Sequence, residues 1–198
     1  RLRTKLDHMR EEGDVFERLT SSEIDHLTEA LVSVDRNQLK QAVELIKTHD
    51  RIFVFGLGPS VSLVDLLEIR LRRFGKQVVG LRSSGREVLE LLLDLKPTDL
   101  VFAVCFIDLN PTLQLVLDLA QETGCPVIAL TDTLEAVVGD KAAVVLAAKR
   151  GPVGEFHSLV VPMTIINTLL LTVARDDQEQ AMANLDRLDD YRQRLSNL

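Results

Sequence analysis

The chain has 198 residues, which is enough for about one globular domain with its own hydrophobic core and too few for two catalytic domains. Hydrophobic residues make up 46% and charged residues 27% of the sequence, a balance that excludes disordered, collagen-like and low-complexity proteins. The formal net charge is −7, and the aromatic residues are limited to seven Phe and one Tyr. This composition lacks the basic surface and the stacking side chains of a nucleic-acid-binding domain.

The sequence shows neither a targeting segment nor a membrane segment. Its most apolar window, residues 159–174, is shorter than the roughly 20 residues that cross a bilayer, and Pro162 and Asn167 interrupt it. The N-terminal residues do not carry the apolar segment of a secretory signal. Cys105 and Cys125 both lie in apolar runs, so we expect buried free thiols and no disulfide, metal site or cofactor. These features predict a cytoplasmic protein.

Helical periodicity dominates residues 1–50. We expect helices over 2–12, 22–34 and 36–48, with Asp35 as the N-cap of the third. After residue 50 the pattern changes to short apolar runs rich in Val, Ile and Phe. These runs are 52–55, 78–81, 100–104, 127–130 and 142–146. Because they are continuous rather than alternating in polarity, they predict strands that are buried on both faces of a parallel sheet.

The stretches between the apolar runs predict crossover helices that connect neighbouring parallel strands. They cover residues 60–74, 86–94, 112–123 and 134–139. Beyond the fifth run, we expect a long apolar helix over 158–174 and an amphipathic, acidic helix over 177–195. The chain is therefore predicted to be an α/β protein, a three-layer αβα sandwich with a five-stranded parallel sheet and additional N- and C-terminal helices.

The loop after the first apolar run is the first candidate site, because open parallel sheets bind ligands beyond the carboxyl ends of their strands. Residues 56–60 read Gly-Leu-Gly-Pro-Ser and lead into a helix. The glycines let the backbone approach a ligand, and the helix N-terminus offers N–H groups to an anion. Ser60 is placed to donate to a phosphate oxygen, or only to cap the helix of an ordinary turn. A dinucleotide fingerprint is not supported, because Val61 occupies the place of its third glycine.

The loops after the second and third runs also carry polar side chains. Ser83 and Ser84 precede a predicted helix and offer two hydroxyls for an oxyanion contact or for an ordinary capped turn. Asn110 is placed to cap the helix that begins at Pro111, and Thr112 stands in the first turn of that helix.

The order and spacing of the motifs resemble a known family. In chain order they are Gly56-x-Gly58-x-Ser60, Arg73-Phe74-Gly75, Thr131-Asp132 and Phe156-His157-Ser158-Leu159, with Pro162 and Asn167 behind the last. Over about residues 20–175 the chain resembles the sugar isomerase (SIS) domain. More narrowly, it resembles the ligand-sensing half of RpiR-type bacterial transcription regulators. The resemblance implies a flavodoxin-like fold and a pocket for a sugar phosphate that includes Gly56, Gly58, Ser60 and Ser158.

The resemblance also implies a domain organisation. In such regulators a helix-turn-helix domain precedes the SIS domain, so we expect contact with DNA only through a domain that this chain does not contain. The first residue is Arg rather than Met, which fits a missing upstream domain. We expect a linker helix in residues 1–20, an SIS effector domain in residues 21–175 and a C-terminal helix in residues 176–198.

The third loop departs from the pattern of the family, which reads Ser-x-Ser-Gly-x-Thr. This sequence has Cys105, Ile107, Asp108 and Asn110 at the four specified places. Hydroxyls are replaced by sulfur and hydrocarbon, and a carboxylate beside a phosphate dianion is unfavourable. Phosphate binding is therefore not expected here, whereas Asn110 and Thr112 are still placed to donate to a hydroxyl of a sugar-like ligand. A non-phosphorylated effector, or a pocket that has lost its ligand, also stays open.

Catalysis is a separate question, because an aldose–ketose isomerase needs a base near pH 7 and a partner that moves protons. Glu155 and His157 are the acid–base pair nearest a predicted strand end. They fit the pocket, and they fit equally the entry to the apolar helix, with Ser158 as its cap. We expect a non-catalytic effector domain in which Glu155 and Ser158 line the pocket. A sugar-phosphate isomerase and a degenerate SIS dimerisation module without ligand stay open as alternatives.

The helix over 158–174 has too few polar positions for a solvated face, so we expect it to be covered on nearly all sides. A second copy of the chain would supply that cover. The expected partners are therefore a sugar phosphate or a related metabolite and a second copy in a homodimer, with no membrane contact.

Overall fold

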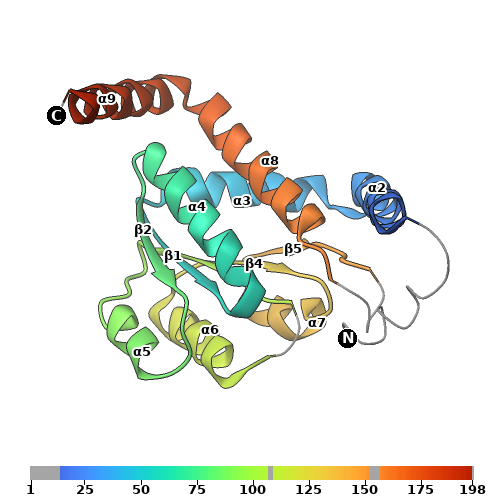
Figure 1. The fold of residues 1–198 in the computed structure, drawn as a ribbon. Helices are drawn as coiled ribbons and strands as arrows, with labels where there is room; N and C mark the ends of the chain where they lie inside the picture. The colour runs from blue at the N-terminus through green and yellow to red at the C-terminus, as the bar shows by residue number, and fades with distance from the viewer. Residues whose placement is uncertain (1–13, 107–108, 152–156, 198) are drawn as a thin grey trace.

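The fold is a parallel β-sheet between two layers of helices. The computed structural model describes residues 14–106, 109–151 and 157–197 (Figure 1). All strands of the sheet are parallel, in the order β2-β1-β3-β4-β5. They are β1 (Arg51–Gly56), β2 (Gln77–Leu81), β3 (Leu100–Val104), β4 (Val127–Thr131) and β5 (Val144–Ala147). The predicted α/β sandwich is confirmed, and the strand order is that of flavodoxin-like folds. The helix expected over residues 2–12 lies outside the described residues.

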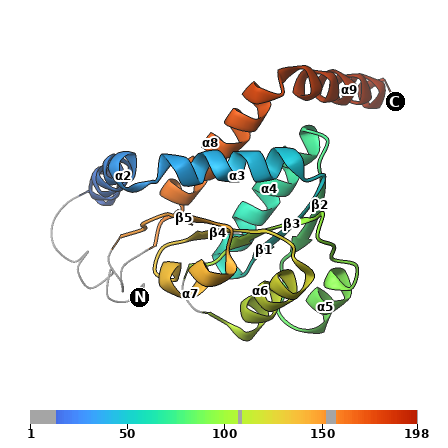
Figure 2. The ribbon, with the colours of Figure 1, turned by 180° about the vertical axis from the view of Figure 1, so that it is seen from behind.

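Each face of the sheet carries its own helices and its own half of the core. One face packs against α3 (Arg36–Thr48), α4 (Val61–Arg73) and α8 (Val160–Asp176), and the other against α5 (Arg86–Leu92), α6 (Pro111–Thr123) and α7 (Glu135–Val138) (Figure 2). Along β1, Ile52 and Val54 point to the first layer while Phe53 and Phe55 point to the second. All four are at most 1% exposed, which is why the run is continuously apolar.

Capping side chains fix several helix ends where the sequence predicted them. Asp35 accepts hydrogen bonds from the backbone N–H groups of Asn37 (2.7 Å) and Gln38 (3.3 Å), so α3 begins at Arg36. Gln38 then reaches the outer strand of the sheet, where its Oε1 accepts from the backbone N–H of Val145 at 2.9 Å. Gly124 ends α6 in the left-handed region at φ +77°, a conformation that favours glycine.

The terminal helices differ from expectation in extent and in cover. α2 (Val15–Ser33) begins at Val15 rather than residue 22, because the Asp14 carboxylate accepts from the N–H of Phe16 at 3.0 Å. The helix runs through residue 20, and the division of the chain at that point stays a prediction. α9 (Gln178–Ser196) extends away from the sheet, and Ala181 is its one buried residue (Figure 1).

The apolar helix α8 is covered on one side, not on nearly all sides. Its buried residues are Val161, Pro162, Ile165, Ile166, Leu169, Leu170 and Val173. The opposite strip, with Thr164, Thr168 and Leu171, is exposed, and Leu171 reaches 71% exposure. A single chain therefore covers only one side of α8, and the cover of the opposite strip by a second copy stays a prediction. No helix in the described part of the chain is long and apolar enough to cross a membrane.

Both thiols should be inert in the folded protein. Cys105 and Cys125 are 5% and 4% exposed, and burial raises the pKa of each thiol to about 12. A disulfide reagent that attacks thiolates should therefore react slowly at pH 8 with the folded chain and rapidly with both thiols in denaturant. The free energy of unfolding should be insensitive to these thiols below their ordinary pKa of 9.0 and should fall above it, where the unfolded thiols ionise. Rapid reaction of either thiol without unfolding would contradict the burial.

Candidate functional site

The strand order places the candidate site at the carboxyl ends of β1 and β3. The chain leaves β1 through α4 toward β2 on one side, while β3 lies on the other side of β1. The last residue of β1, Gly56, pairs in register with Val104, the last residue of β3. The loops that follow these two strands therefore start next to each other. This is the switch point of the sheet, where the order in which the chain adds strands reverses.

The first loop is a tight turn that only glycine permits at two places. A Cβ on Gly56 would lie 2.8 Å from Cγ2 of Val64 and 3.1 Å from the backbone oxygen of Ser60, and Gly58 has φ +59°. The chain then makes a short 3-10 turn, η1 (Gly58–Ser60), and enters α4. Ser60 makes no capping hydrogen bond to the helix, so its predicted capping role is wrong. Its side chain is 8% exposed, and the turn brings backbone N–H groups and the N-terminus of α4 to the switch point.

The second loop lies farther from this point. Ser83 is half-buried and Ser84 exposed, and both follow β2, which is the outer strand beyond β1. Adjacent strands are about 4.8 Å apart, so the end of β2 lies roughly 10 Å from the end of β3. Neither serine caps α5, because its N-cap is Gly85 at φ +111°. The strand order thus places Ser83 and Ser84 after an outer strand, and their role toward a ligand stays a prediction.

The third loop is built as a helix start. The side chain of Asn110 accepts from the backbone N–H of Leu113 at 2.9 Å, which confirms its capping role, and Thr112 is half-buried in the first turn of α6. Cys105 is buried at the entrance of the loop. Ile107 and Asp108 lie outside the described residues. The roles of Asn110 and Thr112 toward a ligand stay predictions.

The segment before α8 contributes one well-defined side chain. Ser158 is 9% exposed, and its hydroxyl oxygen accepts from the backbone N–H of Val160 at 3.1 Å. The N-cap of α8 is Leu159, so the predicted role of Ser158 as the cap is wrong. His157 is half-buried, and its Nδ1 is buried without a hydrogen-bond partner among the described residues. Glu155 lies outside the described residues, so the acid–base pair of Glu155 and His157 stays a prediction.

A buried ion pair that the sequence did not predict lies beside the third loop. Arg150 follows β5, and its Nε and Nη2 lie 2.9 and 2.8 Å from Oδ2 of Asp132, which follows β4. Both side chains are almost fully buried, at 4% and 8% exposure. The guanidinium also stacks on the ring of Phe106, with 3.9 Å between Cζ and the ring centroid, and Thr133 donates to the backbone oxygen of Phe106 at 3.1 Å. The ends of β4 and β5 therefore hold the residue that leads into the third loop.

A signal for this pair was present in the sequence. Asp132 and Arg150 are opposite charges that each follow an apolar run within a few residues. Neighbouring parallel strands end at the same edge, so such charges meet when the two runs are adjacent. The order of β4 and β5 in the sheet was the missing information. In the described ranges, no cluster of His, Cys, Asp and Glu is arranged to hold a metal ion.

Removal of the guanidinium should be costly. Arg150→Met leaves Asp132 as a buried unpaired carboxylate and should lower the free energy of unfolding by about 3–5 kcal/mol, measured by urea denaturation. The double variant Arg150→Met/Asp132→Asn should be more stable than the single one, because it no longer buries a lone charge. Arg175→Met is the matched control, since Arg175 is 74% exposed beside Asp176 and should change stability by less than about 1 kcal/mol. Equal losses in Arg150→Met and Arg175→Met would contradict this account.

Comparisons with known proteins agree with this architecture. The sequence profile of the SIS domain matches residues 44–172. An uncharacterized HTH-type transcriptional regulator of Haemophilus influenzae is 24% identical over 132 residues, which is 67% of this chain and 46% of that protein. The chain thus spans about half the length of this curated relative.

Two solved structures have closely similar folds. The sugar isomerase domain of an RpiR transcription factor from Sphaerobacter thermophilus is 28% identical, with a TM-score of 0.84 over 90% of this chain and 99% of that one. The NanR protein of Vibrio vulnificus, solved in complex with ManNAc-6P, is 23% identical, with a TM-score of 0.76 over 93% of this chain and 71% of that one. The expected resemblance to the SIS domains of RpiR-type regulators is confirmed. The profile match takes in all of the sheet and the first loop, and it shows that the chain belongs to the SIS domain family.

Proposed function

We propose that this chain is the effector-sensing and dimerisation domain of a bacterial transcription regulator. In this proposal it binds a sugar phosphate or a related carbohydrate derivative, catalyses no reaction and works in the cytoplasm. The observation that carries the proposal is the first loop, where a turn that requires glycine at two places brings backbone N–H groups and the N-terminus of α4 to the switch point of the sheet. Such an arrangement favours an anionic group of a ligand.

The phosphate group belongs at the first loop rather than the third. Ser60 is free of any capping hydrogen bond to α4, so its hydroxyl is available to a phosphate oxygen. The side-chain oxygen of Asn110 already accepts a hydrogen bond at the start of α6. The hydroxyls that the family has in this loop are replaced here by residues such as the buried Cys105. The third loop and Ser158 would then contact the sugar rather than the phosphate.

The similar proteins favour sensing over catalysis. The Sphaerobacter chain is the sugar isomerase domain of a transcription factor, and the Vibrio NanR protein was solved with ManNAc-6P, a sugar phosphate. The longer Haemophilus relative is an HTH-type regulator, which fits the proposal that DNA contact comes from a domain outside this chain.

α2 offers a route from the site to an upstream domain. Nζ of Lys149, at the end of β5, lies 2.7 Å from a carboxylate oxygen of Glu29 on α2. Nε2 of His26, also on α2, lies 3.0 Å from the position that a Cβ on Gly151 would take. The residue between these two contacts is Arg150, which holds the start of the third loop. A ligand that moves the third loop would therefore displace Arg150, and the flanking residues Lys149 and Gly151 would transmit this displacement to α2.

A ligand panel tests the sensing proposal. A sugar phosphate at 100 times its dissociation constant should stabilise the folded chain by about 2.7 kcal/mol, which thermal unfolding detects readily. The panel contains hexose and amino-sugar phosphates with their unphosphorylated counterparts, and we expect hits only with phosphate. Ser60→Ala should remove the shift.

Ser62→Ala is the matched control, because Ser62 is exposed in the first turn of α4 and donates to the backbone oxygen of Pro59. It should keep the shift. Equal loss in both serine variants, or hits that ignore the phosphate, would contradict the assigned site. Turnover of a hexose phosphate that is lost in Glu155→Gln would contradict the non-catalytic role.

The proposed homodimer has a surface to account for it. An apolar groove of about 320 Å³ runs between α2 and α8, with Leu27, Leu31 and Ile165 among its lining residues. Leu31 is 70% exposed and Leu171 on the neighbouring strip of α8 is 71% exposed. A second copy that packs its own α2 and α8 here would remove these apolar side chains from water.

Sedimentation equilibrium at micromolar concentration tests this arrangement. The wild-type chain should sediment as a dimer, and Leu171→Glu should shift it toward the monomer by burying a charge in the interface. Leu93→Glu is the control, because Leu93 is 84% exposed beyond α5, on the other layer of helices, and should leave the dimer intact. A monodisperse wild-type monomer would overturn the dimer.

A further inference from the structure

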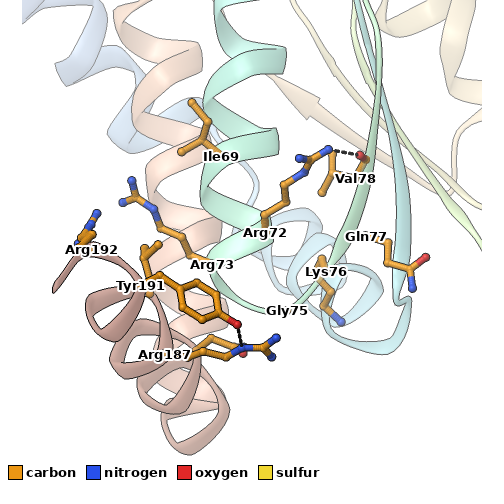
Figure 3. Close-up of a pocket in the computed structure, with 12 residues that line it drawn as sticks. Ile69, Arg72, Arg73, Gly75, Lys76, Gln77, Val78, Arg187, Tyr191 and Arg192 are labelled. Atoms are coloured by element: carbon orange, nitrogen blue, oxygen red, sulfur yellow. Dashed lines mark hydrogen bonds between the residues drawn. The ribbon is translucent and has the colours of Figure 1, made fainter. Parts of the chain in front are cut away.

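A second, chemically distinct cavity lies at the opposite end of the sheet from the candidate effector site. It is a groove of about 780 Å³ between the C-terminal end of α4 and the first half of β2 on one side and α9 on the other (Figure 3). Gln77, the first residue of β2, belongs to its lining, so the groove lies at the amino ends of the strands. The groove is open to solvent, and its volume is in the range of sites that bind small organic ligands.

The lining of this groove is basic in a protein that is acidic as a whole. Five of the 23 basic residues of the chain line it, and none of the acidic residues that the structure describes does, although the net charge is −7. They are Arg72, Arg73, Lys76, Arg187 and Arg192. Such a local reversal of charge raises the concentration of anions in the groove.

Not all of these charges are neutralised by carboxylates at the rim. Arg72 pairs with Glu68 at 2.5 Å, and Arg192 pairs with Asp189 at 2.8 Å. Arg73 forms no ion pair with the described part of the chain, and Nε of Arg187 donates to the neutral hydroxyl of a tyrosine. At least two guanidinium groups are thus available to an anion, and planar guanidinium groups match phosphate oxygens well.

The groove also contains an aromatic ring and an unsatisfied amide. Tyr191 is 48% exposed and receives the hydrogen bond from Arg187 at 2.8 Å, so its ring is held at a defined place beside the cations (Figure 3). Nδ2 of Asn184 is buried and has no hydrogen-bond partner among the residues that the structure describes. It lies 3.0 Å from the position of a Cβ on Gly75, whose φ of +82° favours glycine. The side chains of Ile69 and Leu188 complete an apolar wall.

We infer that this groove binds a phosphorylated aromatic ligand of the nucleotide class. The phosphates lie against Arg73 and Arg187, and the flat base lies on the ring of Tyr191 and the apolar wall. Asn184 donates its free amide N–H to an oxygen of the ligand. This chemistry differs from that of the effector site, which presents a glycine turn and a serine instead of several cations and an aromatic ring.

α4 connects the two sites. It starts at the first loop and ends in the groove, so its 13 residues span about 20 Å between them. Leu63, Val64, Leu67 and Leu71 anchor the helix in the core and are fully buried. A ligand that shifts α4 at one end therefore acts on the other end through a rigid element, and any coupling between the two ligands must be reciprocal.

Titration calorimetry of the full chain with ATP tests this inference. ATP should bind the wild-type chain, and adenosine should bind far more weakly, because it lacks the phosphates. Arg73→Gln and Arg187→Gln should each weaken ATP binding about tenfold. Arg70→Gln is the matched control, because Arg70 is exposed on the same helix outside the groove and its loss removes the same charge. It should leave the ATP affinity within about twofold.

Tripolyphosphate separates the role of the ring from that of the charges. It should bind more weakly than ATP, and Tyr191→Leu should abolish this difference by weakening only ATP. Tyr191→Phe keeps the ring and should keep the preference for ATP. Ser60→Ala should leave ATP binding unchanged, so failure of the effector site is distinguishable from failure of the groove.

The inference is overturned if ATP does not bind the wild-type chain. It is also overturned if Arg70→Gln weakens ATP as much as Arg73→Gln does, because the attraction is then a property of net charge. Equal affinities for ATP and tripolyphosphate in the wild-type chain would exclude the aromatic part of the site.

Discussion

A parallel sheet that is buried on both faces is the constraint on which the rest of this structure depends. Hydrophobic side chains leave β1 in both directions, Ile52 toward one helix layer and Phe53 toward the other, so neither layer can be absent. Parallel strands also require crossover connections, which bring the carboxyl ends of all strands to one end of the sheet and the amino ends to the opposite end. The two candidate sites lie at these two ends of the sheet. The glycine turn follows β1 at the carboxyl end, and the basic groove lies by the start of β2 at the amino end.

Much of the fold could be predicted because it depends on local chemistry. The continuous apolar runs gave all strands to within about two residues, and Asp35 and Asn110 cap the helices that the sequence assigned to them. The first loop was also predictable, because Gly56 and Gly58 are required by contacts and by a positive φ within a few residues of each other. These features need no knowledge of which strands are neighbours.

The remaining features depend on which segments meet in space. Arg150 and Asp132 are 18 residues apart, and they form an ion pair only because β4 and β5 are adjacent. The guanidinium of this pair stacks on the ring of Phe106. Ser83 and Ser84 looked equivalent to the other loop residues until the strand order placed β2 at the outside. The basic groove joins residues near 75 to residues near 190, and no periodicity in the sequence predicts that contact.

The side chain of Gln38 has a consequence for association between molecules. β5 is an outer strand, and an outer strand presents unpaired N–H and C=O groups to which another chain can add a strand. The Gln38 oxygen occupies the N–H of Val145, near the middle of this four-residue edge. A glutamine on a helix thereby occupies one backbone donor of this edge, which disfavours the addition of a strand from another molecule to β5. On this side of the molecule, association then favours helical surfaces, where side-chain packing rather than backbone pairing selects the partner.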